Sequence, residues 1–185
     1  MRRESLHRDP VDALEWARHY LGDLIYGAND GIITTFAVVA GVTGGALSQQ
    51  AVLVVGVANL FADGLSMGVG NYLSIRSRES AREAQNLPEE EARPVRHGGA
   101  TMLAFVVAGS LPLVPFVLPT LPIERFPLSA LFTLAALFGV GSSRALVTVD
   151  RWWSAGLEML ALGVLVAAAA YGSGALVASL LAGTA

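Results

Sequence analysis

Residues 27–41, GANDGIITTFAVVAG, and residues 56–74, GVANLFADGLSMGVGNYLS, decide the fold, because each stretch is typical of a membrane-spanning helix. Both are apolar and rich in small residues, yet each carries one aspartate, Asp30 in the first and Asp63 in the second. A carboxylate in the middle of a bilayer costs about 2.5–3.5 kcal/mol on insertion scales. These two acids are therefore predicted to serve a function, by binding an ion, a proton or a partner charge.

The overall composition agrees with a membrane protein. The chain has 185 residues, of which 54% are hydrophobic and only 15% are charged, whereas soluble domains average about 25% charged residues. One domain is expected at this length. The absence of cysteine excludes disulfides and thiolate metal sites, and the net charge of -3 argues against a nucleic-acid partner.

The hydrophobic segments predict an all-α membrane protein with five transmembrane helices, since a span needs about 20 mainly apolar residues. The predicted spans are residues 23–45, 51–75, 99–119, 128–147 and 154–181. Residues 1–22 form a charged N-terminal segment at the cytoplasmic membrane surface, with an amphipathic stretch that leads into the first span. The transmembrane domain then covers residues 23–185 and includes a short cytoplasmic loop at 76–98.

The arginines predict the orientation of the chain. Only Arg125 falls on one side of the predicted membrane. The other 11 flank the opposite side, at Arg2, Arg3, Arg8, Arg18, Arg76, Arg78, Arg82, Arg93, Arg96, Arg144 and Arg151. The positive-inside rule places that side and the N-terminus in the cytoplasm, so that five spans leave the C-terminus outside or in a lumen.

A helical wheel gives each of the first two spans one polar face. In the second span this face holds Asn59, Asp63 and Met67, and in the first it holds Asp23 and Asp30. The opposite faces are apolar and are expected to meet lipid. Small residues at four-residue spacing also permit close helix packing, and asparagines form interhelical hydrogen bonds, so packing remains an open alternative for the glycines and asparagines.

Apart from Arg144 at the end of the fourth predicted span, no arginine or histidine lies within a span, so Asp30 and Asp63 must be protonated, hydrated or bound to a cation. Met67 follows Asp63 by one turn and adds a soft thioether, which favours a transition metal over Mg2+ or Ca2+, although methionine also serves as a core filler. Glu158 either reaches the interface or forms the vestibule of a path. The candidate metal ligands are Asp30, Asp63, Met67, Asn59 and Glu158.

Residues outside the spans carry weaker signals. In the 76–98 loop, glutamates alternate with arginines, which is typical of a solvated, self-paired surface, and the loop is expected to matter little for metal selectivity. His7, His19 and His97 are scattered without ligand spacing and are expected to be solvated. No nucleotide-binding, zinc-protease or hydrolase motif is present, so neither an enzyme nor an ATP-driven pump is expected.

Residues 23–45, DLIYGANDGIITTFAVVAGVTGG, and residues 56–77, GVANLFADGLSMGVGNYLSIRS, resemble the first two helices of the vacuolar iron transporter family. The motifs are an Asp-Gly in the first span and SMG-x-G-x-YL late in the second. The resemblance implies a homodimer whose metal path between protomers contains Asp30 and Met67. It also implies Fe2+ export from the cytoplasm against protons, often with Mn2+ as a second substrate.

The same resemblance marks two departures. Asn59 stands where iron-transporting plant members tend to carry a glutamate, and Asp63 supplies a carboxylate one turn later. Plant members also carry a long metal-binding domain, rich in glutamate and methionine, between the second and third spans. Here the short loop at 76–98 takes its place.

These observations predict a proton-coupled transporter of divalent transition metals, with Fe2+ or Mn2+ as substrate, H+ as counter-ion and no permanently bound cofactor. The alternative is a non-transporting membrane scaffold whose intramembrane acids dock a partner helix. The expected partners are the lipid bilayer, the divalent metal ion and a second copy of the chain. The expected location is the inner membrane of a bacterial cell, or an organelle membrane in a eukaryote.

Overall fold

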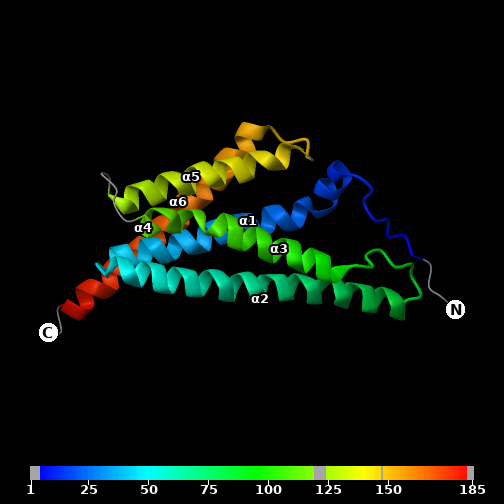
Figure 1. Ribbon diagram of the computed structural model, residues 1–185, viewed down its shortest axis with the longest axis horizontal. Coiled ribbons are helices and arrows are strands. Elements are labelled where there is room, and N and C mark those ends of the chain that lie inside the picture. Colours follow the sequence, from blue (N-terminus) through cyan, green and yellow to red (C-terminus); the bar gives the residue numbers. More distant parts are fainter. Residues whose placement is uncertain (1–4, 119–123, 147, 183–185) are drawn as a thin grey trace.

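The computed structural model describes residues 5–118, 124–146 and 148–182 as a bundle of helices (Figure 1). Five of them are long and apolar enough to cross a membrane, which confirms the predicted fold class. The helices are α1 (Ala13–Gly44), α2 (Gln49–Ala84), α3 (Pro94–Gly109) with its continuations η1 (Leu111–Leu113) and α4 (Val114–Val117), α5 (Arg125–Ser143), η2 (Arg144–Leu146) and α6 (Trp152–Ala182). The predicted span ends at 119 and 147 lie outside the described residues, as do Arg2 and Arg3.

Two helices extend beyond their predicted spans at the arginine-rich end of the bundle, which is the end that holds the start of α1 and the 85–93 loop. Asp12 caps α1, because its side chain accepts a hydrogen bond from the backbone N–H of Glu15. The expected surface stretch is therefore continuous with the first span. At the other junction, α2 continues to Ala84, so that only residues 85–93 remain as the loop to α3.

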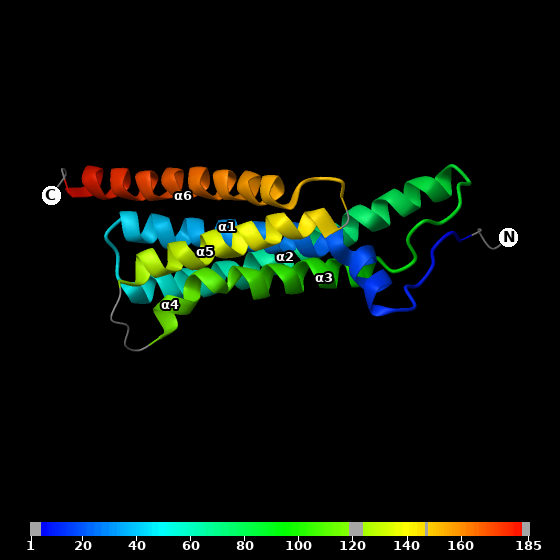
Figure 2. The ribbon, with the colours of Figure 1, turned by 90° about the horizontal axis from the view of Figure 1, so that it is seen from above.

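Helix α1 is the centre of the bundle, in contact with α2, α3, α5 and α6. Figure 2 shows it between α6 on one side and α2 with α3 on the other. Gly27 and Gly31 allow α3 to approach closely, because a Cβ atom at either position would lie within 2.3–2.4 Å of a backbone oxygen, that of Thr101 or Phe105. These two glycines are therefore packing residues, as small residues at helix crossings in membranes commonly are.

The helices run alternately up and down, which gathers the arginine-bearing segments. The N-terminal segment, the 85–93 loop and the connection between α5 and α6 lie toward one end, while α6 finishes at the other (Figures 1 and 2). Large apolar side chains cover the outer faces of α2 and α6, where Phe61, Leu65 and Leu165 are more than half exposed. A surface of this kind suits contact with lipid.

Candidate metal path between the first two helices

Asp30 and Asp63 lie at the same depth in the bundle. Asp30 precedes the end of α1 at Gly44 by 14 residues (44 − 30), and Asp63 follows the start of α2 at Gln49 by 14 residues (63 − 49). The two helices are antiparallel neighbours joined by a short turn. With a rise of 1.5 Å per residue, both carboxylates are about 21 Å along their helices from that turn.

The two carboxylates interact with each other. They lie close enough to repel when both are ionised, and each side chain is half-buried. In the described part of the chain, neither forms an ion pair with an arginine or a histidine. A cation or a proton bound between Asp30 and Asp63 would relieve this repulsion.

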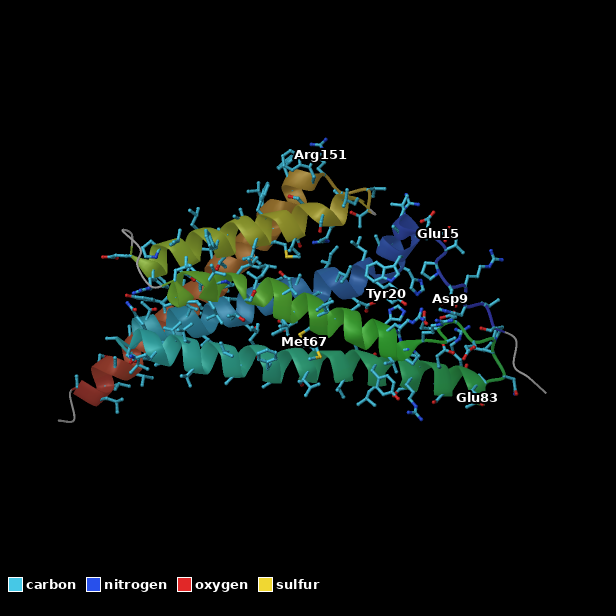
Figure 3. The ribbon with its side chains drawn as sticks, in the orientation of Figure 1. Asp9, Glu15, Tyr20, Met67, Glu83 and Arg151 are labelled. Carbon is cyan, nitrogen blue, oxygen red and sulfur yellow. The ribbon has the colours of Figure 1, made fainter. Side chains whose placement is uncertain are left out.

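Asn59 and Met67 flank Asp63 by one helical turn on either side, and all three side chains are half-buried. Met67 lies near the middle of α2 (Figure 3) and packs against the apolar cluster that contains Phe105 and Leu60. The methionine thus combines a packing role with a place beside the carboxylate. The structure brings Asp30, Asp63, Met67 and Asn59 to one region of the α1–α2 pair.

Glu158 is placed differently. It lies near the start of α6, where it is exposed and forms an ion pair with Arg144 at 3.1 Å. Helix α6 packs on α1 and α5. Because its charge is already balanced at the surface, Glu158 is the weakest of the five candidate ligands.

A strip of small residues lies on α2 beside Asp63. Ala62, Ser66 and Gly70 follow one another at four-residue spacing, and all three are exposed. A Cβ atom on Gly70 would meet nothing within 4 Å. The strip is therefore a smooth surface against which another helix could pack closely.

A second polar group lies two turns from Asp30, toward the arginine-rich end. Asp23 on α1 accepts a hydrogen bond from the Asn71 amide at 2.6 Å, and its other oxygen lies 2.5 Å from Nδ1 of His97 on α3. The Asn71 amide also donates to Thr101 at 2.8 Å. These contacts join three helices. Asn71 is thus an interhelical hydrogen-bond partner, which is the packing role left open for the asparagines of the spans.

The expectation that the histidines are solvated is wrong. His97 is only 8% exposed, the side chain of His7 is 7% exposed, and His19 is half-buried. The reason is a long-range contact: residues before α1 pair with the 85–93 loop, where the Leu6 N–H donates to the Glu89 carbonyl at 2.8 Å. A partial signal existed in the sequence, because His19 precedes Asp23 by one turn on the polar face of α1.

The comparisons with known proteins agree with this architecture. The VIT family matches residues 21–93 and 80–175 of the chain. A protein of Toxoplasma gondii named vacuolar iron transporter is 43% identical over 40% of this chain and 28% of its own length. Vacuolar iron transporter 2 of Oryza sativa is 26% identical over 81% of this chain and 84% of its own length. Vacuolar iron transporter 1 of Arabidopsis thaliana is 25% identical over 80% of this chain and 82% of its own length.

Proposed function

The chain belongs to the VIT family, and on that premise we propose that this integral membrane protein moves divalent transition-metal ions, Fe2+ or Mn2+, in exchange for protons. Relatives named as iron transporters align with most of the chain, which supports metal-ion transport. The observation that carries the proposal is the pair Asp30 and Asp63, two interacting carboxylates at one depth of neighbouring helices.

The proposed mechanism needs only this set of acids. Carboxylates bind a divalent cation when they are ionised, so metal loading displaces their protons. Protons that arrive from the opposite side then neutralise Asp30 and Asp63 and release the metal. The amide of Asn59 and the thioether of Met67 complete the site. The soft sulfur disfavours Mg2+ and Ca2+, which prefer oxygen ligands. Glu158 is left outside the path.

The arginines predict the orientation of the chain, because the positive-inside rule places the arginine-rich end in the cytoplasm. We propose that in this orientation metal leaves the cytoplasm and protons enter it. The relatives that are named vacuolar transporters come from plants and apicomplexan parasites. They therefore give no support to the expected bacterial inner membrane.

We propose further that two copies of the chain form the path. The strip of Ala62, Ser66 and Gly70 is exposed in one protomer and flanks Asp63. Packing of this strip against its symmetry mate would bring Asp30 and Asp63 of both protomers around one axis. Up to four carboxylates would then face the ion.

Flux measurements on proteoliposomes test the proposal. Fe2+ or Mn2+ is supplied outside vesicles with an acidic interior, and metal uptake and interior pH are followed together. We expect uptake that accelerates as the interior is made more acidic, and an interior pH that rises as metal enters. The proposal assigns no catalytic activity. Folded protein without metal flux would favour the scaffold alternative, and flux without proton movement would remove the antiport mechanism.

A further inference from the structure

Four side chains from separate parts of the sequence meet at the arginine-rich end of the bundle. They form the histidine–glutamate cluster, which consists of His7 before α1, His19 on α1, Glu91 in the 85–93 loop and His97 on α3. Ring nitrogens of His7, His19 and His97 lie 3.2, 3.3 and 3.0 Å from the Glu91 carboxylate. Donor atoms of His7, His19 and Glu91 all lie within 4.8 Å of one another, which is close enough to share one metal ion.

Four imidazole nitrogens of this cluster are buried without hydrogen-bond partners. Both ring nitrogens of His7, Nε2 of His19 and Nε2 of His97 are shielded from solvent, and their approaches to Glu91 lack hydrogen-bond geometry. Buried nitrogens in proteins are normally hydrogen-bonded or bound to a metal. Three imidazoles this close would repel one another if all were protonated. A shared cation would satisfy their lone pairs together.

A hydrogen-bonded carboxylate orients one of the imidazoles, and a second carboxylate lies near another. Asp23 holds Nδ1 of His97 at 2.5 Å, which leaves the Nε2 lone pair directed toward Glu91. Asp9 lies 3.5 Å from Nε2 of His7 without a hydrogen bond, and Nδ1 of the same ring lies 3.2 Å from Glu91. A carboxylate on the far nitrogen of a histidine is the usual arrangement around protein-bound metals, because it fixes the tautomer and the ring orientation.

The groups around Glu91 hold its loop in place and favour the ionised carboxylate. The backbone N–H of Glu91 donates to Glu79 at 3.1 Å, which holds this part of the loop against α2. Burial opposes ionisation of the carboxylate. The N–H of Arg93 and the adjacent His97 and His7 outweigh burial, however, and lower the pKa of Glu91. An anionic oxygen therefore faces the histidine nitrogens at neutral pH.

We propose that the histidine–glutamate cluster binds a first-row divalent transition-metal ion, with His7, His19 and Glu91 as ligands and His97 as the fourth donor. Three nitrogens and one carboxylate suit such ions and not Mg2+ or Ca2+. The arginine side chains nearby do not occupy the cluster. Arg93 pairs with Asp9, and Arg82 pairs with Glu90 at 2.7 Å.

The position of the cluster gives it a role as the entrance to the metal path, an assignment that rests on the proposed transport function. A cavity of about 330 Å³ is lined by His19, Asp23, Asn71, Glu91 and His97, and its wall also includes Arg78, Glu79 and Glu90. Asp23 precedes Asp30 by seven residues on α1, about 10 Å along the helix, and Asn71 follows Met67 by one turn on α2. Binding of metal at the cluster would thus raise the local metal concentration beside the path.

Binding of Co2+ to the purified full chain tests the site without any transport. The measurement uses chain that carries Asp30→Asn and Asp63→Asn, so that the path ligands do not contribute, and follows the visible absorption of bound Co2+. We expect one bound Co2+ per chain, displaced by Fe2+ or Zn2+. Adding Glu91→Gln or His19→Gln should weaken binding at least about tenfold, the loss typical of one ligand or its support. Glu83→Gln is the matched control, because Glu83 is an exposed acid at the C-terminal end of α2, near the 85–93 loop.

The outcomes separate this inference from the proposed function. Absence of Co2+ binding, or equal affinity in Glu91→Gln, His19→Gln and Glu83→Gln, would overturn the site; circular dichroism confirms that each variant is folded. In vesicles, Glu91→Gln in otherwise unchanged protein should raise the metal concentration for half-maximal flux and keep the maximal rate. Co2+ binding without any flux in the wild type would keep the site and reject transport. Flux that is identical in Glu91→Gln would reject the entrance role.

Discussion

Asp30 and Asp63 differ from the acids at the arginine-rich end in what surrounds them. Asp9, Glu90 and Glu91 each face an arginine or a histidine, whereas the two intramembrane carboxylates interact with each other. A pair of half-buried like charges is destabilising unless it shares a cation or a proton. The charge that would bind a metal ion at this pair therefore also lowers the stability of the protein.

Replacing either aspartate by asparagine should separate these two effects. We expect Asp30→Asn and Asp63→Asn each to reduce metal flux to the level of protein-free vesicles, because the amide cannot bind a cation by charge. Thermal stability in detergent should hold or rise, since one buried charge is removed. Flux and melting temperature measured on the same preparations check this. Wild-type flux in either folded variant would exclude that residue from the path.

Met67→Leu should change metal preference more than stability. The substitution nearly conserves volume, and such swaps typically cost less than about 1.5 kcal/mol. Loss of the thioether should reduce the preference for Fe2+ over Mn2+, which is the harder ion. Competition between the two ions for uptake measures this. An unchanged ratio would leave Met67 with only its packing role against Phe105 and Leu60.

The sequence predicted single residues well only where the helical period governs their position. Asp30, Asp63, Met67 and Asn59 could be placed on facing surfaces because a residue every 3.6 positions shares a face. The histidine–glutamate cluster could not be predicted. Its members are brought together by the pairing of the N-terminal segment with the 85–93 loop, and no local period encodes that contact.

At the level of the helices, the crossing of α1 and α3 fixes the core. Gly27 and Gly31 bring the two backbones into contact, and Gly109 returns the contact from α3, where a Cβ atom would lie 2.7 Å from the Gly31 oxygen. The number of spans could be predicted correctly from the sequence, because hydropathy and length are local properties. Helix α2 continues to Ala84, beyond the predicted span end at 75, because the charged residues that follow the span remain helical.

Gly31→Ala should therefore destabilise the protein, whereas Gly99→Ala should not. The new methyl at residue 31 would lie 2.4 Å from the backbone oxygen of Phe105, and forced backbone shifts typically cost about 1–3 kcal/mol. Gly99, on α3, has nothing within 4 Å, so alanine there should stabilise the helix by up to about 1 kcal/mol. Melting temperatures in one detergent compare the pair. Equal shifts would contradict the close α1–α3 crossing.

In the whole molecule, the face of α2 beside Asp63 is left open on one side. Asp63 is half-buried, and the strip of Ala62, Ser66 and Gly70 beside it is exposed. Apolar residues such as Phe61 and Leu65 on the same helix suit lipid, but lipid is a poor neighbour for an ionised carboxylate. A second copy of the chain would cover the carboxylate and exclude lipid from the ion.

Gly70→Leu tests this assembly with little disturbance of the protomer. A leucine at residue 70 has room within one chain, because a Cβ atom there meets nothing within 4 Å, but it would hold two α2 helices apart. We expect the variant to purify mainly as a monomer and to lose most of its metal flux. Gly139→Leu, at an equally open position on α5, should leave assembly and flux unchanged. Light scattering of the detergent complexes gives the mass, and proteoliposomes give the flux.

A Gly70→Leu protein that remains dimeric with wild-type flux would show that α2 does not form the interface. A wild type that is monomeric and active would show that one chain encloses the whole path.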